Sequence, residues 1–160
     1  MIKKLFSASL ILAIALSVFS VSPKSAQATN WPSWHWETQY ISQFQTIQVA
    51  VDDRCGNASP AFRVTLFEGG NFTGARAKIC GYWDDLSQLP QYKGAPATKT
   101  FNNSVSSYNV TYLPNSNYYI LFSSGKNQNG PILWARGEGS VNESGGDVDN
   151  IMSSLKRGSL

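Results

Sequence analysis

Two six-residue runs of short polar side chains nearly repeat each other in this chain. The first run covers residues 102–107 (NNSVSS), and the second covers residues 149–154 (DNIMSS). Each has an amide or an acid at its first two positions and hydroxyls at its last two. One such run is ordinary turn chemistry, but a matched pair in two similar contexts is much stronger evidence for a shared role and indicates an internal repeat. Hard cations such as calcium bind the kinds of oxygen that these runs concentrate.

The first 28 residues have the pattern of an export signal. Lys3 and Lys4 precede an apolar segment over residues 5–21, and Ala26-Gln27-Ala28 forms a small-x-small cleavage pattern. We therefore expect a secreted protein whose mature chain begins near Thr29. No later apolar stretch is long enough to span a bilayer, so we expect no transmembrane segment after the signal is removed.

The charge of the chain argues against a nucleic-acid partner. The full sequence has 13 Lys and Arg residues and 10 Asp and Glu residues. Lys3, Lys4 and Lys24 belong to the signal segment, which leaves equal numbers of basic and acidic residues in the mature chain. Nucleic-acid surfaces need a clustered excess of basic side chains, and the sequence has none.

The two cysteines, Cys55 and Cys80, both lie in the exported part of the chain. Cysteines that reach an oxidising compartment usually pair, so we predict a disulfide between them. Two free thiols remain the alternative. A metal site is disfavoured, because neither cysteine has a second Cys or a His at ligand spacing.

Apolar and polar residues alternate with period two over most of the mature chain. Such short alternating segments, separated by Gly, Asn, Pro and Ser, are typical of half-buried strands. They cover residues 47–52, 62–67, 75–80, 108–113 and 118–122, with a further short apolar run at 132–134. Helical periodicity is scarce, with at most a turn or two around residues 84–89. The sequence therefore predicts an all-β protein.

A second repeat overlies these strands. Residues 67–74 (FEGGNFTG) place an aromatic residue seven positions before a glycine, and residues 122–130 (FSSGKNQNG) place one eight positions before. Each is followed by a strand and then by one of the polar runs. Glycine at such a corner permits a positive φ, which predicts a folded hairpin in each half.

The combination of aromatic corner, glycine and downstream oxygen-rich run resembles the Greek-key motif of the βγ-crystallin superfamily. The paired polar runs look like those of its microbial calcium-binding members, and the resemblance covers residues 62–160. It implies a two-sheet β-sandwich of paired Greek-key motifs over residues 61–160, preceded by a Trp-rich N-terminal extension at 29–60. The second corner departs from the pattern by one inserted residue. The chain also resembles, more loosely, secreted bacterial metalloprotease inhibitors of the crystallin type.

The resemblance implies that each calcium ion is shared between the motifs, with a hydroxyl and a carbonyl from one loop and an Asn or Asp oxygen from the other. Ser107 and Ser154 are instead interpreted as structural, tying each folded hairpin to its own motif. Because Asp149 would be the only charged ligand side chain of the two runs, we expect weak sites, about 10⁻⁴ M or weaker. The alternative is that both loops are only hydrogen-bonded turns. The candidate ligands are Asn102, Asn103, Ser106, Asp149, Asn150 and Ser153, with main-chain oxygens from Ser104, Ile151, Glu68 and Ser123.

Nothing in the sequence predicts an enzyme. His35 is the only histidine and lies in the Trp-rich segment, without a nucleophile pattern nearby. The acidic pairs at 52–53 and 84–85 consist of sequence neighbours, which would point to opposite faces of a strand. We interpret both pairs as turn residues.

Three tasks outside the cell fit a non-catalytic module, which we expect to be a monomer, and the sequence leaves them open. The chain could inhibit a metalloprotease through the Gly94-Ala95-Pro96-Ala97 connection, independently of calcium. It could act as a toxin-like module or bind a cell wall or glycan through its tryptophans. It could also be a durable coat or stress protein. The tryptophans themselves either contact such a target or, as we favour, pack against the domain.

Overall fold

The computed structural model describes residues 32–142 and 149–159, which belong to the unit of the chain spanning Trp31–Leu160. The predicted signal segment, residues 1–28, lies outside the described residues. Within the described ranges, no helix is long and apolar enough to cross a membrane.

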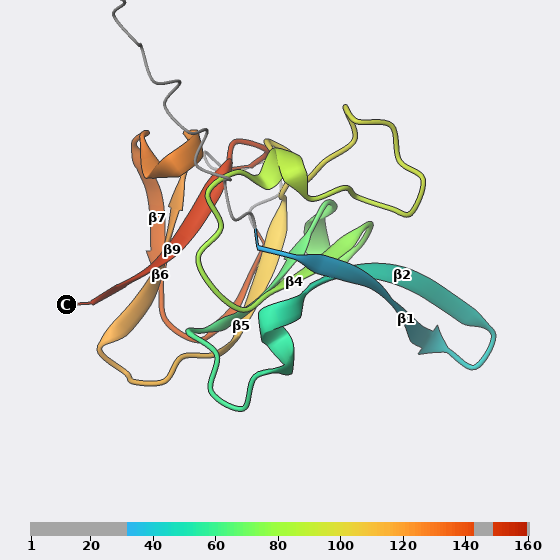
Figure 1. Ribbon diagram of the computed structural model, residues 1–160, viewed down its shortest axis with the longest axis horizontal. Helices are drawn as coiled ribbons and strands as arrows, with labels where there is room; N and C mark the ends of the chain where they lie inside the picture. Colours follow the sequence, from blue (N-terminus) through green and yellow to red (C-terminus); the bar gives the residue numbers. More distant parts are fainter. Residues whose placement is uncertain (1–31, 143–148, 160) are drawn as a thin grey trace, which may run out of the picture. The chain divides into compact units, whose positions relative to one another are not determined.

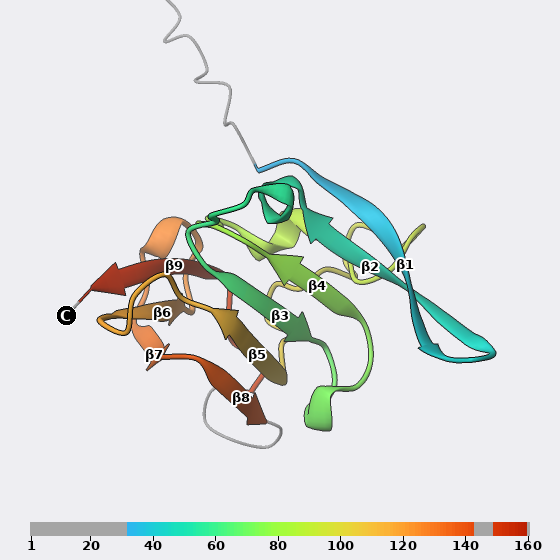
Figure 2. The same ribbon diagram turned by 90° about the horizontal axis from the view of Figure 1, so that it is seen from below.

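In the part of the chain that the structure describes, nine strands form two sheets (Figures 1 and 2). The six-stranded sheet has the order β1-β2-β4-β3-β5-β8, and the three-stranded sheet has the order β7-β6-β9. Their bounds are β1 Trp34–Ser42, β2 Gln45–Asp52, β3 Arg63–Phe67, β4 Arg76–Ile79, β5 Ser107–Tyr112, β6 Tyr118–Ser123, β7 Ile132–Arg136, β8 Gly139–Asn142 and β9 Ser154–Ser159. Short 3-10 turns lie between them: η1 Asp53–Gly56, η2 Gly70–Phe72, η3 Leu86–Gln88 and η4 Lys126–Gln128.

The strand order is that of two Greek keys that exchange their third strands. In the first motif, β4, β3 and β5 are neighbours, while the segment at Trp83 crosses to the other sheet and bridges Leu155 of β9. In the second motif, β7, β6 and β9 are neighbours, while β8 crosses back and pairs with β5. The predicted all-β sandwich of paired Greek keys is therefore confirmed.

The core lies between the two sheets, where the inward positions of the alternating segments meet. Val64 and Leu66 of β3 and Tyr108 and Val110 of β5 are buried, whereas the residues between them face outward or lie at the edge. Trp83, on the exchanged segment, is fully buried and belongs to the same core cluster. Burying a large apolar side chain contributes about 1.5–3 kcal/mol, so this alternation is the main stabilisation of the fold.

Within the predicted N-terminal extension, residues 34–52 form a β-hairpin that joins the larger sheet. β1 and β2 are antiparallel, and β2 joins the first motif by parallel pairing of Val49–Val51 with β4. Trp34 and Trp36 are partly buried, stack edge to face with ring centroids 5.3 Å apart, and pack against the core cluster. For these two rings, the favoured interpretation, that the tryptophans pack against the domain, is therefore confirmed.

The predicted disulfide between Cys55 and Cys80 is present, with Cα atoms 5.0 Å apart. Beside it, the carboxylate of Asp52 is completely buried and accepts hydrogen bonds from the Arg54 guanidinium, the nearest at 2.6 Å, and from the Cys80 amide at 3.1 Å. The interpretation of Asp52 as a turn residue misses this role. A buried carboxylate persists because its charge and lone pairs are matched by such donors.

Candidate metal sites between the two motifs

The two polar runs lie against each other, although 47 residues separate their starts in the chain. The amide of Asn103 donates a hydrogen bond to the carbonyl of Met152 at 2.8 Å, and the amide of Asn150 donates one to the carbonyl of Val105 at 3.1 Å. Each loop thus holds the other by its backbone. The side chains of Val105 and Met152 are fully buried and anchor both loops in the core.

The side chains of the two runs also pair reciprocally, so an approximate two-fold relation connects the two motifs here. The hydroxyl of Ser153 donates to the Asn103 side-chain oxygen at 2.9 Å. The hydroxyl of Ser106 donates to the Asn150 side-chain oxygen at 3.3 Å. In both cases the fifth position of one run meets the second position of the other. These contacts bring together candidate ligand residues from opposite motifs, which the resemblance nominates.

The backbone of each run turns at its second residue. Asn103 has φ 53° and Asn150 has φ 59°, so both occupy the left-handed region. Asparagine tolerates this region better than other non-glycine residues. The choice of Asn at these positions therefore serves the turn as well as any ligand, and it directs each amide oxygen toward the opposite loop.

The oxygens of the two runs fit a hard cation. Two ligands of one calcium ion at 2.3–2.6 Å lie roughly 3 Å apart, which is close to the two hydroxyl–amide separations. In addition, the side-chain oxygen of Asn102 is buried and has no hydrogen-bond partner among the described residues. A buried acceptor without a donor costs free energy, and a bound cation would remove that cost.

The candidate side chains of these sites include one carboxylate and no imidazole. The residues that the structure describes contain no cluster of three or more His, Cys, Asp or Glu side chains suited to a metal ion. Asp149, half-buried, supplies the charge of the second run. The donor set is therefore mostly neutral amide, hydroxyl and main-chain oxygen, which suits a weak calcium site rather than a zinc site.

Main-chain oxygens of Ser104 and Ile151 are further candidates from the resemblance. The hydroxyl of Ser104 is engaged elsewhere, because it donates to the carbonyl of Thr100 at 2.6 Å and accepts from the Gln91 amide at 2.9 Å. Only its carbonyl is then a candidate for an ion. Ile151 is half-buried at the matching position of the second run.

The hairpin corners have equal lengths in the two motifs, so the predicted one-residue insertion is wrong. In strand register Phe67 pairs with Ser107, and Ser123 pairs with Ser154. Matching 3-10 turns follow, with positive φ at residues 71 and 72 in one motif and at 127 and 128 in the other. Ser123 therefore corresponds to Phe67, and Ser124 is the counterpart of Glu68. Alignment on the aromatic residues places the two corners one position out of register.

Ser107 and Ser154 tie each corner to its own motif, as predicted. The hydroxyl of Ser107 donates to the carbonyl of Gly69 at 2.7 Å and accepts from the amide of Phe72 at 3.0 Å. The hydroxyl of Ser154 donates to the carbonyl of Gly125 in the same way. Both serines are fully buried.

The exchanged third strands add a second link between the motifs. The amide of Asn127 donates to the carbonyl of Asp84 at 2.7 Å, and the amide of Asn71 donates to the side chain of Asn142 at 3.0 Å. The Lys126 ammonium lies 2.8 Å from the carboxylate of Asp85. Burial acts to raise the pKa of Asp85, but hydrogen bonds from Lys126 and Ser87 outweigh it and hold the pKa below its usual value.

A separate cavity of about 460 Å³, with a mixed polar and apolar lining, lies on the six-stranded sheet beside the disulfide. His35 lies at its rim, with Nδ1 2.6 Å from a carboxylate oxygen of Asp53 and Nε2 3.4 Å from Glu37. The ammonium of Lys78 in turn lies 3.7 Å from the carboxylate of Glu37. Because the two acids contact opposite sides of the imidazole ring, His35 has no free nitrogen for a nucleophile.

No protein-family model and no curated protein matches the chain. Solved structures of βγ-crystallin domains do. One, described as "Evolution of the eye lens beta-gamma-crystallin domain fold", is 21% identical and has a TM-score of 0.46, covering 66% of this chain and 92% of that one. A double mutant of a βγ-crystallin domain from Clostridium beijerinckii is 26% identical with a TM-score of 0.45, covering 61% and 98%. A βγ-crystallin from an archaeon is 22% identical with a TM-score of 0.42, covering 60% and 96%.

The chain has a βγ-crystallin-like fold. This assignment rests on the strand order, the exchanged third strands and the two matched corners.

Proposed function

We propose that this protein is an exported, non-catalytic module that binds calcium at the two inter-motif sites. The observation that carries the proposal is the reciprocal pairing of Ser106 with Asn150 and of Ser153 with Asn103. The buried side-chain oxygen of Asn102 supports it further. Because the ligands come from both motifs, only the folded chain assembles them, and calcium stabilises that state.

Calcium acts here as a structural ligand. Few charged ligands imply a dissociation constant of about 10⁻⁴ M or weaker, which suits an extracellular module. An exported protein meets calcium at millimolar concentration, so such sites would be largely filled. The candidate ligands act by closing the two loops on each other around each ion.

Isothermal calorimetry with calcium tests this proposal directly. Ser106→Ala and Ser153→Ala each remove one shared hydroxyl, and each should weaken or abolish one of two binding events. Ser116→Ala, an exposed serine in the β5–β6 connection, is the matched control and should bind like the unaltered protein. Absence of calcium binding by the unaltered, folded protein would refute the proposal.

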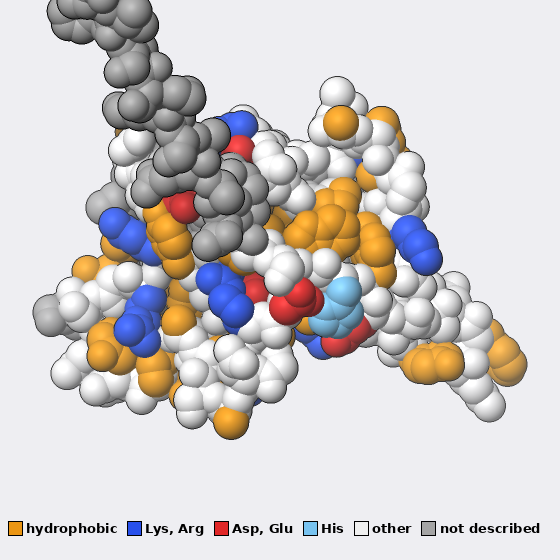
Figure 3. Space-filling view, in the orientation of Figure 1, with side chains coloured by type: hydrophobic (Ala, Val, Ile, Leu, Met, Phe, Trp, Pro, Cys, Tyr) orange, Lys and Arg blue, Asp and Glu red, His pale blue; other side chains and the backbone are white. Residues whose placement is uncertain are grey.

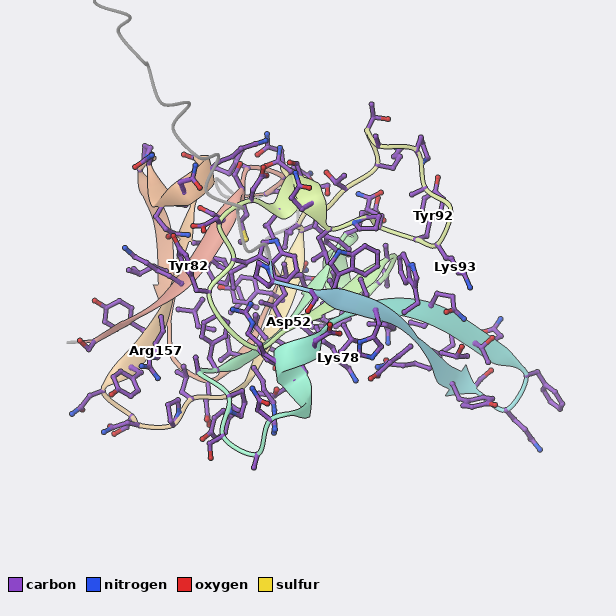
Figure 4. The ribbon with its side chains drawn as sticks, in the orientation of Figure 1. Asp52, Lys78, Tyr82, Tyr92, Lys93 and Arg157 are labelled. Atoms are coloured by element: carbon purple, nitrogen blue, oxygen red, sulfur yellow. A yellow bond between two sulfur atoms is a disulfide. The ribbon has the colours of Figure 1, made fainter. Side chains whose placement is uncertain are left out.

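The exposed connection after η3 favours a second candidate, inhibition of an extracellular metalloprotease. Residues 92–99 are mostly exposed, and two hydrogen-bonded turns stabilise them. The backbone amide of Ala95 donates to the carbonyl of Tyr92 at 2.9 Å, and that of Lys99 donates to the carbonyl of Pro96 at 2.8 Å. Figure 4 shows Tyr92 and Lys93 on this loop, which extends from the body of the unit. A braced, projecting loop suits an inhibitor, because little conformational entropy is lost on binding.

Incubation with a panel of secreted metalloproteases tests the inhibitor proposal. The unaltered protein is compared with a variant whose residues 94–97 are replaced by Gly and Ser. Inhibition that the loop variant loses, with and without calcium, supports it. Inhibition that the variant keeps would assign the contact to another surface, and no inhibition of any enzyme would count against this candidate.

A further inference from the structure

The β1–β2 hairpin projects from the body of the unit (Figures 1 and 2). β2 pairs with β4 only through Val49–Val51, so residues 45–48 pair with β1 alone. The outer half of the hairpin is therefore a free two-stranded ribbon. Isolated ribbons of this kind are marginally stable in water, and burial of one end against a partner would favour this one.

The tip of this ribbon carries three exposed large apolar side chains, including the two most exposed of those that the structure describes. Phe44 is 90% exposed, Tyr40 80% and Ile41 46%. Figure 3 shows hydrophobic side chains at the end of the hairpin, surrounded by uncharged polar surface. We define the tip as Tyr40, Ile41 and Phe44. Side chains so exposed have no structural role inside the unit.

The ribbon has no charged residue from position 38 to position 51. Glu37 and Asp52, at its base, are the first charges on either side. Some of its polar groups also bind one another. The side-chain amide of Gln48 donates to the Thr38 hydroxyl at 2.7 Å, and the backbone amide of Phe44 donates to the Ser42 hydroxyl at 3.4 Å. Moving the three tip side chains out of water would then desolvate no charge.

We propose that the tip inserts into the interfacial region of a lipid bilayer. A bilayer accepts a convex, uncharged prong without a matching cavity, whereas a protein partner must supply one. Tyrosine and phenylalanine suit this region, because their rings bury apolar area while the tyrosine hydroxyl stays hydrated. Because the ribbon has no basic residue, the contact depends on apolar burial and not on anionic lipids.

Sedimentation with phosphatidylcholine vesicles tests the inference, using the chain from Thr29, which retains the unit that contains the hairpin and lacks the apolar segment at 5–21. The unaltered chain should bind the vesicles equally at low and high salt. The double variant Tyr40→Ser/Phe44→Ser should bind roughly a hundredfold less, about tenfold for each ring. Tyr82→Ser removes an exposed ring from another surface and should bind normally. Unchanged melting curves confirm that all three chains fold.

Three results would overturn the inference. The unaltered chain could fail to bind the vesicles, or the double variant could bind as well as the unaltered chain. Binding restricted to anionic vesicles and lost in salt would assign the contact to cations outside the ribbon. Sedimentation equilibrium without lipid tests the remaining alternative, which is a dimer. If the unaltered chain is a dimer and the double variant is a monomer, a second copy of the chain covers the tip.

Discussion

Buried hydroxyls at the ends of the two polar runs hold the corners of both motifs. Ser107 satisfies a carbonyl and an amide of the first corner, and Ser154 does the same for the second. Each hydroxyl is both donor and acceptor, a combination that no apolar side chain of similar size offers. The corners contain non-glycine residues in the left-handed region, including Phe72 and Gln128, and such residues require support from their surroundings.

Replacement of Ser107 by alanine should lower the free energy of unfolding by about 2–3 kcal/mol. The substitution leaves a buried carbonyl and a buried amide of the corner without partners, each at a cost of about 1–3 kcal/mol that partial access of water reduces. Urea denaturation of Ser107→Ala and of the exposed control Ser116→Ala measures the difference. An equal midpoint for the two variants would contradict this role of Ser107.

His35 should make the stability of the β1 attachment depend on pH. The hydrogen bond with Asp53 raises the pKa of His35 above its ordinary 6.5, and Glu37 adds to the effect. A folded-state pKa raised in this way contributes stability below about pH 6.5, and that contribution disappears as the pH rises through the folded pKa.

The melting temperature of the unaltered protein should therefore exceed that of His35→Gln at about pH 5.5, and the excess should shrink by about pH 9. Hydrogen bonds from Ser33 and then His35 lower the pKa of Asp53, so the pair stays charged down to pH values below the ordinary 3.8 of the carboxyl. An NMR titration of the imidazole provides the direct value. A His35 pKa at or below 6.5 would be incompatible with the observed geometry.

Among the elements, alternation of apolar and polar residues predicts five of the nine strands that the structure describes, and the apolar run at 132–134 predicts a sixth, β7. The strands that neither pattern predicts have specific reasons. β1 alternates inward Trp34 and Trp36 with outward His35 and Glu37, but the dense aromatic run obscures that period. β8 is short and almost entirely polar, because it is an exchanged edge strand. β9 begins within the second polar run, so the pattern assigns its first residue to the loop.

The sequence is sufficient to predict which residues make up the candidate sites, but not which atoms of the two loops contact each other. The repeated runs identify the residues, and the resemblance identifies the sharing between motifs. The contacts of Asn103 with Met152 and Ser153 depend on the exchange of third strands, which brings the loops together over long sequence distances. An alignment of the two corners on their aromatic residues is one position out of register. Gly69 and Gly125, which precede matching turns, are the equivalent positions.

The disulfide joins η1 to the end of β4 and should stabilise the hairpin attachment. Cys55 and Cys80 are 25 residues apart, and closing a loop of that size contributes about 3 kcal/mol in the chain-entropy model. The double variant Cys55→Ser/Cys80→Ser should lose about that amount in chemical denaturation. A loss well below about 1 kcal/mol would mean that the Asp52–Arg54 cluster alone holds this corner.

For the whole molecule, the same approximate two-fold relation governs the sheets, the corners and the two polar loops. Calcium ligands taken from both halves would couple the motifs, because neither motif alone completes a site. The projecting β1–β2 hairpin falls outside this relation, since among the described residues only the first motif has such an addition. The proposed calcium binding and the proposed membrane contact would therefore be separable.

Thermal melting across a calcium titration tests the central claim most directly. About 10 mM calcium is up to about a hundred times the expected dissociation constant. Each site should then add up to about 2.7 kcal/mol and raise the melting temperature by up to roughly 5–10 °C. Ser106→Ala/Ser153→Ala should lose most of this increase, and magnesium should reproduce little of it. A melting temperature that stays constant from zero to about 10 mM calcium would contradict the account.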